Sequence, residues 1–248
     1  MMLLLLKAIW HRVKIPLAIL NAGLLFSPSC VGIPTTWNAN DFSKFKDEEV
    51  SEDVAIWLES GKQSAITNRI GDEARGIAGS NRRERLFRVM GHIWRTFSYD
   101  PWLNAVAFSR TAEELFISRA LGGCSDFALV EITLFRALGI PSRLVITANV
   151  DWMHSYSTDP LAMSEGHSFI EVFLEDKWYL VDTTYRYLFS DYDQESMSYP
   201  HGEYFCRRGK DFWDMGIKSL PDADQVLRST ASNYKAGFRE PRYPKHPL

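Results

Sequence analysis

A cysteine preceded by two glycines is the strongest chemical signal in this sequence. Cys124 follows Gly122 and Gly123 and opens a stretch, 124–138, whose apolar residues recur at helical spacing. A thiol in the first turn of a helix has a lowered pKa, because the free N–H groups and the helix dipole favour the thiolate. The backbone N–H of Cys124 is also a natural donor to an oxyanion, and the glycines let a substrate backbone approach. Cys124 is therefore the candidate nucleophile.

A thiol nucleophile needs a base, and the base needs a group that orients it. His167 opens one predicted strand, 167–174, and Asp182 lies near the end of the next, 178–183. With a tight turn between the strands, His167 comes opposite Thr184, and Asp182 lies two residues along on the same face. A spacing different by one residue would turn Asp182 away. The hairpin thus predicts His167 as general base and Asp182 as the residue that orients it.

The elements that position these residues run from helices to strands. Apolar residues at helical spacing predict helices over 81–97 and 124–138, and a capping box at Thr111 predicts the start of another. A stretch rich in Val, Ile and Thr predicts a strand at 143–150, and the polar residues 151–165 indicate a loop before the hairpin. Helices followed by an antiparallel sheet are typical of the α+β class, here with the nucleophile at the N-terminus of the central helix.

The residues around these positions resemble the transglutaminase-like superfamily, which has a papain-like fold and includes bacterial cysteine peptidases. The segments that carry the resemblance are GGCSDFALVEITLFRALGIPSRLV, with Cys124, and GHSFIEVFLEDKWYLVDTT, with His167 and Asp182. The resemblance covers about residues 82–187 and, position by position, implies the same catalytic triad. Two departures leave the triad untouched: Thr183 stands where the family often has proline, and one residue separates His167 from the next aromatic residue.

The resemblance implies a class of chemistry rather than one reaction. Active members of the family form a thioester with the acyl group of an amide, and the histidine protonates the leaving amine. Water as acceptor gives a peptidase or amidase, whereas a lysine-type amine gives a protein-glutamine acyltransferase. We favour hydrolysis of a protein or peptide substrate, since cross-linking requires a second site for the amine. The alternative is a catalytically silent binding or scaffold protein of the cell envelope.

The first thirty residues differ from the rest of the chain. An apolar start, a basic stretch with Lys7, Arg12 and Lys14, an apolar run at 15–26 and small residues before Cys30 follow the order of a secretory signal. The apolar run is shorter than the roughly 20 residues that span a bilayer. We therefore expect export to the periplasm, the cell envelope or the medium. An uncleaved N-terminal anchor or a lipidated Cys30 would instead tether the protein to a membrane.

The chain divides into four predicted segments. They are a signal peptide or anchor at 1–30, a helical and loop-rich extension at 31–81, the catalytic core at 82–187, and an aromatic C-terminal extension at 188–248 that packs on the core and has a weak helical signal near 222–233.

Composition and charge exclude several functions. The 248 residues carry a formal net charge of −3, whereas a nucleic-acid-binding domain needs a basic face. The histidines show no metal-ligand spacing and Asp191 with Asp193 is a weak calcium signal, so we expect no metal and no cofactor. Three cysteines are too few for a disulfide scaffold, although Cys30 and Cys206 could pair.

Other residues are weaker candidates. Candidate substrate contacts are Gly123, Trp152, His154 and Tyr156, the last three in the loop expected before the hairpin. Asp126 could contact substrate, but we favour a role at the positive end of its own helix. For Arg143 we favour a structural ion pair over binding of a substrate carboxylate.

Overall fold

The computed structural model describes residues 42–77, 79–190, 192–234, 239 and 245–247, which belong to the unit 38–248. The expected signal sequence, Cys30 and Asp191 lie outside these residues. The helices are α1 (Glu52–Ala55), η3 (Ile56–Leu58), α2 (Asn68–Arg75), α3 (Arg82–Thr96), η4 (Pro101–Val106), α4 (Ala112–Ser118), α5 (Cys124–Ala137), α6 (Val150–Tyr156), η5 (Pro200–Gly202) and α7 (Leu220–Asn233).

Two sheets are present in the described part of the chain. The smaller pairs β1 (Ser98–Tyr99) with β2 (Ala120–Leu121) in parallel. The larger is antiparallel, with the strand order β7-β8-β3-β4-β5-β6-β9. Its strands are β3 (Ser142–Asn149), β4 (Gly166–Leu174), β5 (Lys177–Asp182), β6 (Tyr187–Phe189), β7 (Ser198–Tyr199), β8 (Glu203–Gly209) and β9 (Lys245–Pro247). The fold is therefore α+β, as the order of predicted elements indicated.

Local sequence explains where the main helices begin. The Asn81 side chain accepts a hydrogen bond from the Glu84 N–H and so caps α3. Thr111 and Glu114 form the expected capping box of α4. Helix α5 begins at Cys124 directly after Gly123, as predicted.

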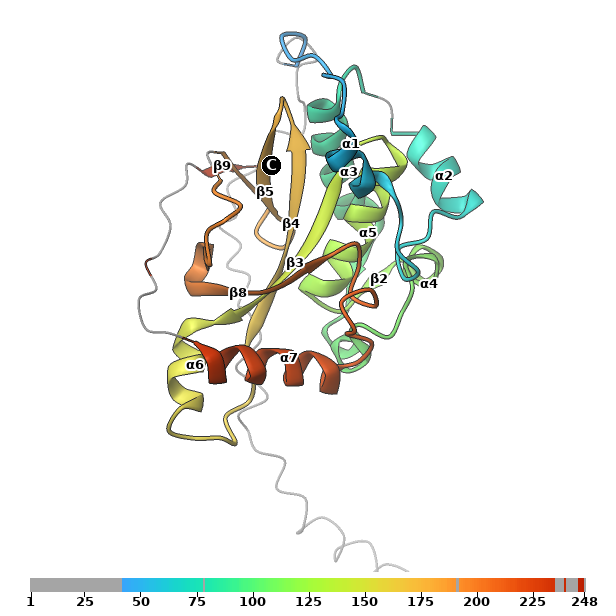
Figure 1. Ribbon diagram of the computed structural model, residues 1–248. Helices are drawn as coiled ribbons and strands as arrows, with labels where there is room; N and C mark the ends of the chain where they lie inside the picture. The colour runs from blue at the N-terminus through green and yellow to red at the C-terminus, as the bar shows by residue number, and fades with distance from the viewer. Residues whose placement is uncertain (1–41, 78, 191, 235–238, 240–244, 248) are drawn as a thin grey trace, which may run out of the picture. The chain divides into compact units, whose positions relative to one another are not determined.

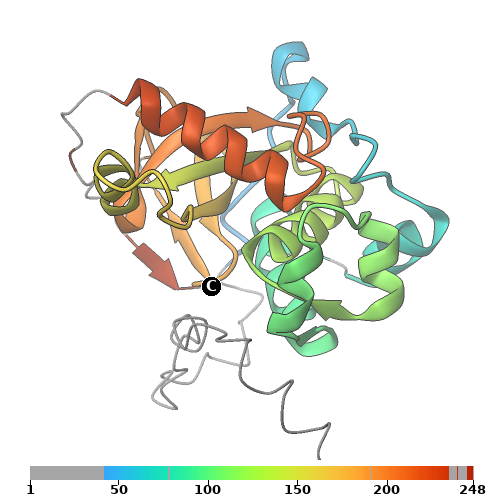
Figure 2. The same cartoon turned by 90° about the horizontal axis from the view of Figure 1, so that it is seen from below.

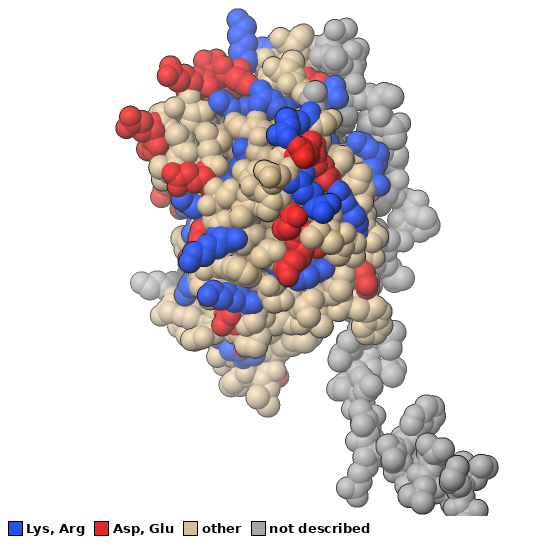
Figure 3. Space-filling model, turned by 90° about the vertical axis from the view of Figure 1, so that its right-hand side faces the viewer, with Lys and Arg blue, Asp and Glu red and all other residues tan. Residues whose placement is uncertain are grey.

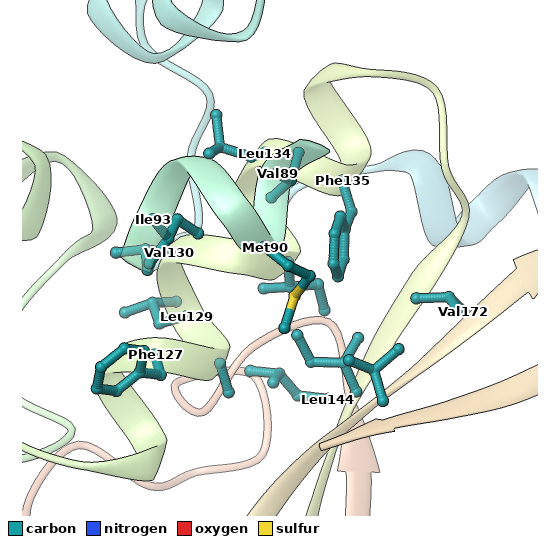
Figure 4. Close-up of a cluster of buried hydrophobic side chains, with 14 of the residues drawn as sticks. Val89, Met90, Ile93, Phe127, Leu129, Val130, Leu134, Phe135, Leu144 and Val172 are labelled. Carbon is teal, nitrogen blue, oxygen red and sulfur yellow. The ribbon is translucent and has the colours of Figure 1, made fainter. Parts of the chain in front are cut away.

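The helices α2 to α5 lie on one side of the sheet, as Figure 1 shows, and Figure 2 shows the same separation from below. Buried side chains of α3 and α5 fill the space between them and the strands (Figure 4). The labelled ones are Val89, Met90 and Ile93 of α3, Phe127, Leu129, Val130, Leu134 and Phe135 of α5, and Leu144 and Val172 of the sheet. Helix α5 is buried along almost its whole length, so the position of its first residue is fixed by the core.

The β4–β5 hairpin has the predicted register. Leu174 pairs with Lys177, and the ladder runs back to Ile170 opposite Val181. The two turn residues between the strands both have positive φ, which matches the twist of a two-residue hairpin. Because side chains alternate across a strand, this register keeps His167 and Asp182 on one face.

Two expectations about irregular segments were wrong. Residues 151–156, expected within a loop, belong to α6, because the Asn149 side chain accepts a hydrogen bond from the Trp152 N–H and caps the helix. The segment after Tyr187 contains strands, and β8 pairs with β3 along its length. Its polar and aromatic residues lack clear alternation, so only the pairing with β3 shows that this segment is part of the sheet.

Charges of both signs lie side by side on the face of the molecule in Figure 3. Ion pairs join α2 to α4, for example Arg69 to Glu113 at 3.1 Å. Within the part of the chain that the structure describes, no helix combines the length and the apolar character needed to cross a membrane.

Candidate active site

Cys124 occupies the first helical position of α5 and is partly exposed. The glycine before its N-cap is required by packing, because a Cβ at Gly122 would lie 2.5 Å from the backbone carbonyl carbon of Leu103. Among the described residues the backbone N–H of Cys124 has no hydrogen-bond acceptor. It is therefore available to an oxyanion that forms beside the thiol.

Asp126 holds the start of α5. Its carboxylate is 3% exposed, accepts a hydrogen bond from the Gly122 N–H at 2.7 Å and pairs with Arg110. Burial raises the pKa of Asp126, while the Gly122 hydrogen bond and the Arg110 charge oppose that rise. With all these contacts inside the protein, Asp126 serves the helix start, the role favoured from the sequence, rather than a substrate.

His167 and Asp182 are joined by a hydrogen bond from Nε2 to Oδ1 at 3.2 Å. The hairpin register places both on one face, and the His167 ring packs edge-on against Phe169. Because Nε2 is engaged by Asp182, Nδ1 is the ring nitrogen left for the Cys124 thiol. The structure thus brings together the three residues that the sequence selected.

Burial lowers the pKa of His167, but the negative charge of Asp182, its hydrogen bond and the interaction with the Cys124 thiol raise it well above the usual value. Burial acts to raise the pKa of Asp182, yet the charge and hydrogen bond of His167, with further hydrogen bonds from His201 and the Tyr185 backbone, hold it far below the usual value. The pair therefore favours a carboxylate beside an imidazolium over a wide pH range.

Asp182 is fully buried and accepts four hydrogen bonds. Oδ1 accepts from His167 and from the backbone N–H groups of Thr184 at 3.1 Å and Tyr185 at 3.0 Å. Oδ2 accepts from His201 Nε2 at 3.0 Å. These bonds offset the cost of burying the charge and hold the carboxylate in one orientation.

Three polar residues near the site were not selected from the sequence. His201 lies in an irregular segment whose spacing from Asp182 predicts nothing. Glu203, at the start of β8, accepts a hydrogen bond from Thr147 Oγ1 at 2.8 Å and interacts with the charges of both site histidines. Glu131 did have a signal: it is a charged residue inside the apolar stretch 127–132, and it lies seven residues after Cys124 and hence on the same face of the helix.

The remaining substrate-contact candidates separate into two groups. Gly123 adjoins the nucleophile. Trp152 is 4% exposed and its ring stacks on Tyr156, while His154 meets Tyr234 edge-on. These three residues lie on α6 and not in the expected loop. Trp152 is buried, Tyr156 is half-buried and His154 is exposed, so their contact with a substrate stays a prediction.

Arg143 is structural, as favoured from the sequence. Its guanidinium pairs with the buried Glu171, which also accepts hydrogen bonds from Tyr192, Tyr199 and Arg208. Asp193 accepts a hydrogen bond from the Glu195 backbone in a local turn. No group of three or more His, Cys, Asp or Glu side chains among the described residues is arranged to hold a metal ion.

An α+β fold with a thiol at the start of its buried central helix, beside a histidine and a carboxylate from an adjacent hairpin, defines the papain-like class. Residues 69–183 match the model of the Transglutaminase-like superfamily. This central part of the chain is therefore a transglutaminase-like core.

Comparison with solved structures agrees on the fold. A Cytophaga hutchinsonii protein provisionally named a cysteine protease has a TM-score of 0.50 and 20% identity over 68% of this chain, which spans 51% of that protein. A Parabacteroides distasonis protein provisionally named a protease has a TM-score of 0.36 and 16% identity over 51% of this chain and 25% of that one. A TGase has a TM-score of 0.30 and 13% identity over 63% of this chain and 37% of that one. Both are too distant to support a conclusion. No curated protein matches the sequence.

Proposed function

We propose that the protein is a cysteine enzyme that forms a thioester acyl-enzyme at amide bonds of a protein or peptide, with hydrolysis as its reaction. The observation that carries the proposal is the arrangement of Cys124 at the free N-terminus of α5 beside the His167–Asp182 pair. All three groups of a nucleophile, base and orienting acid meet in one place.

In the proposed reaction the Cys124 thiolate forms a bond to the carbonyl carbon of the amide. The oxyanion lies toward the unpaired Cys124 N–H. His167, held as imidazolium by Asp182, gives its proton to the leaving amine as the C–N bond breaks. His167 then takes a proton from water, the resulting hydroxide attacks the thioester carbonyl, and the C–S bond breaks to release a carboxylic acid and the Cys124 thiolate beside the His167 imidazolium.

Hydrolysis and acyl transfer share the thioester intermediate and differ only in the molecule that accepts the acyl group. Water needs no binding site, whereas an amine acceptor needs one, and this difference favours hydrolysis. Once a substrate peptide is found, turnover with and without an added alkylamine measures the partition directly. Predominant amide product at low amine concentration would reassign the protein as an acyltransferase.

Thiol reactivity tests the proposal before any substrate is known. We expect iodoacetamide to alkylate Cys124 at pH 6, where an ordinary thiol is almost fully protonated. His167→Ala should slow this reaction by at least about tenfold, since the imidazolium partner of the thiolate is lost. The labelled peptide is identified by mass spectrometry, and Cys124→Ser is the negative control.

Cys206 provides an internal control in the same chain. Burial raises the pKa of Cys206 to about 12, so it should remain unlabelled throughout. Slow labelling of Cys124 that is indifferent to His167→Ala would contradict the proposal and favour the silent scaffold.

Export is also proposed, from residues 1–30. N-terminal sequencing of the secreted or periplasmic protein tests it, and an intact leader there would contradict cleavage.

A further inference from the structure

The Asp182 carboxylate binds two histidines, one on each oxygen. His167 donates to Oδ1 at 3.2 Å and His201 donates to Oδ2 at 3.0 Å. An ionised carboxylate can only accept hydrogen bonds, so the Nε2 atom of each histidine must carry the proton. Within the described part of the chain, His201 is the one donor to Oδ2.

The backbone conformation and the ring contacts of His201 fit this position. Its backbone is left-handed, with φ 66° and ψ 26°, between Pro200 and Gly202. A non-glycine residue adopts this conformation at an energetic cost. Its ring lies 4.8 Å from the Tyr185 ring and parallel to Phe169 at 6.4 Å. Both backbone and packing thus direct Nε2 toward Asp182.

We propose that His201 is a positioning residue of the active site, which fixes the Asp182 carboxylate so that Oδ1 meets His167. The proposal rests on the proposed function and adds to it a residue outside the family match, which ends at residue 183.

Loss of the His201 donor would leave Oδ2 buried and without its partner. An unsatisfied buried charge is costly, so the carboxylate would turn toward another donor or admit water. Either movement lengthens the hydrogen bond from His167 to Asp182. The imidazolium form of His167, which faces Cys124, then becomes less stable. His201 thereby acts through Asp182 and His167 without touching the reacting atoms.

Two substitutions separate the hydrogen bond from the packing. His201→Gln keeps a side-chain N–H of similar reach, whereas His201→Phe keeps a flat ring against Tyr185 and Phe169 but has no donor. Both retain a Cβ in the left-handed conformation, so the backbone cost is matched. Thermal unfolding of the full chain confirms that each variant is folded before its chemistry is compared.

The first readout is the iodoacetamide rate at Cys124 from pH 5 to pH 9. We expect the alkylation rate of His201→Gln to remain within about twofold of wild type. The rate of His201→Phe at pH 6 should fall about tenfold, because a less stable His167 imidazolium holds less of Cys124 as the thiolate. Equal rates for wild type and His201→Phe would overturn the proposal, as would a His201→Gln rate as low as that of His201→Phe.

The second readout is NMR of the histidine ring N–H protons. Wild type should show exchange-protected signals from His167 and His201. His201→Phe removes the His201 signal and should shift the His167 signal, and an unshifted His167 signal would overturn the proposal.

The His167→Ala control keeps the two hypotheses distinguishable. If His167→Ala labels as fast as wild type, the proposed function fails and the role of His201 fails with it. If His167→Ala is slow while His201→Phe is normal, only the inference about His201 fails.

Discussion

At the scale of single residues, the site contains three buried carboxyl groups in different electrostatic environments. Asp182 accepts four hydrogen bonds, two of them from histidines, and its pKa is lowered despite its burial. Burial raises the pKa of Glu203, against the charge of His167 and the Thr147 hydrogen bond. Such divergent environments are typical of sites that move protons, and they assign the negative charge to Asp182.

Glu131 should be neutral in the folded protein. Burial first, and then the negative charge of Asp182, raise the pKa of Glu131 well above its usual value, and Arg186 only partly opposes this. Neither carboxyl oxygen has a hydrogen-bond partner among the described residues. A folded-state pKa above the unfolded one makes stability complete below about pH 4.5 and progressively lower as the pH rises toward the folded-state pKa.

We therefore predict that Glu131→Gln is more stable than wild type at pH 7 and equal to it near pH 4. Glutamine does not titrate, so the variant keeps the stability that wild type loses as the pH rises above 4.5. That loss is about 1.4 kcal/mol for each unit by which the pKa of Glu131 differs between the folded and unfolded states. Urea unfolding at pH 4, 5.5 and 7 measures it. A difference that does not depend on pH would mean that Glu131 is ionised in the folded protein.

At the scale of elements, the start of α5 determines where the nucleophile lies. Gly122 is in contact with the backbone of Leu103 and Asn104, so the η4 segment lies against the glycine pair that precedes Cys124. The Gly122 N–H also donates to Asp126, one turn further along the same helix. The thiol is positioned by backbone contacts on one side and by a capped helix on the other.

We predict that Gly122→Ala displaces the start of α5, because its Cβ would lie within 2.6 Å of two backbone atoms that cannot move independently. Expected are a loss of about 2–4 kcal/mol in the free energy of unfolding and slow alkylation of Cys124 at pH 6.

The matched control is Gly71→Ala. A Cβ at Gly71, in α2, would meet only the end of the Arg75 side chain at 3.6 Å. That variant should gain about 0.5–1 kcal/mol from helix propensity and keep the alkylation rate. A Gly122→Ala protein as stable and reactive as Gly71→Ala would contradict the steric account.

At the scale of the whole described unit, the C-terminal segment completes the sheet and the site. Strand β8 pairs with β3, and the turn just before it supplies His201. A buried ionic network binds the same segment to the hairpin: Glu171 on β4 meets Arg143 on β3 and Arg208 on β8. Residues 187–209 thus contribute strands β6, β7 and β8 to the same sheet as the hairpin.

Glu171→Gln tests that connection. We predict a loss of about 3–5 kcal/mol in the free energy of unfolding, since two largely buried arginines lose their counter-charge. Arg75→Gln, which breaks an exposed pair with Asp72, should change stability little. Denaturant unfolding compares them, and equal effects would show that the Glu171 network does not hold the segment.

The sequence by itself determined the local parts of this protein. Gly122-Gly123-Cys124 marks the helix start, the capping residues of α3 and α4 stand next to the helices they begin, and the hairpin register follows from a two-residue turn. These features depend on neighbours along the chain, so residue types and spacing are enough to predict them. For the same reason His167 and Asp182 could be placed on one face before any coordinates.

Only the tertiary structure decided what depends on contacts between distant segments. His201 reaches Asp182 from an irregular turn, and β8 becomes a strand because β3 offers it a free edge. Helix α6 stands where a loop was expected, because Trp152 is buried by tertiary packing. The polar residues next to Trp152 in the sequence gave no sign of that packing. Such contacts arise from the way the chain folds back on itself, and they carry no periodicity or spacing that a single sequence can show.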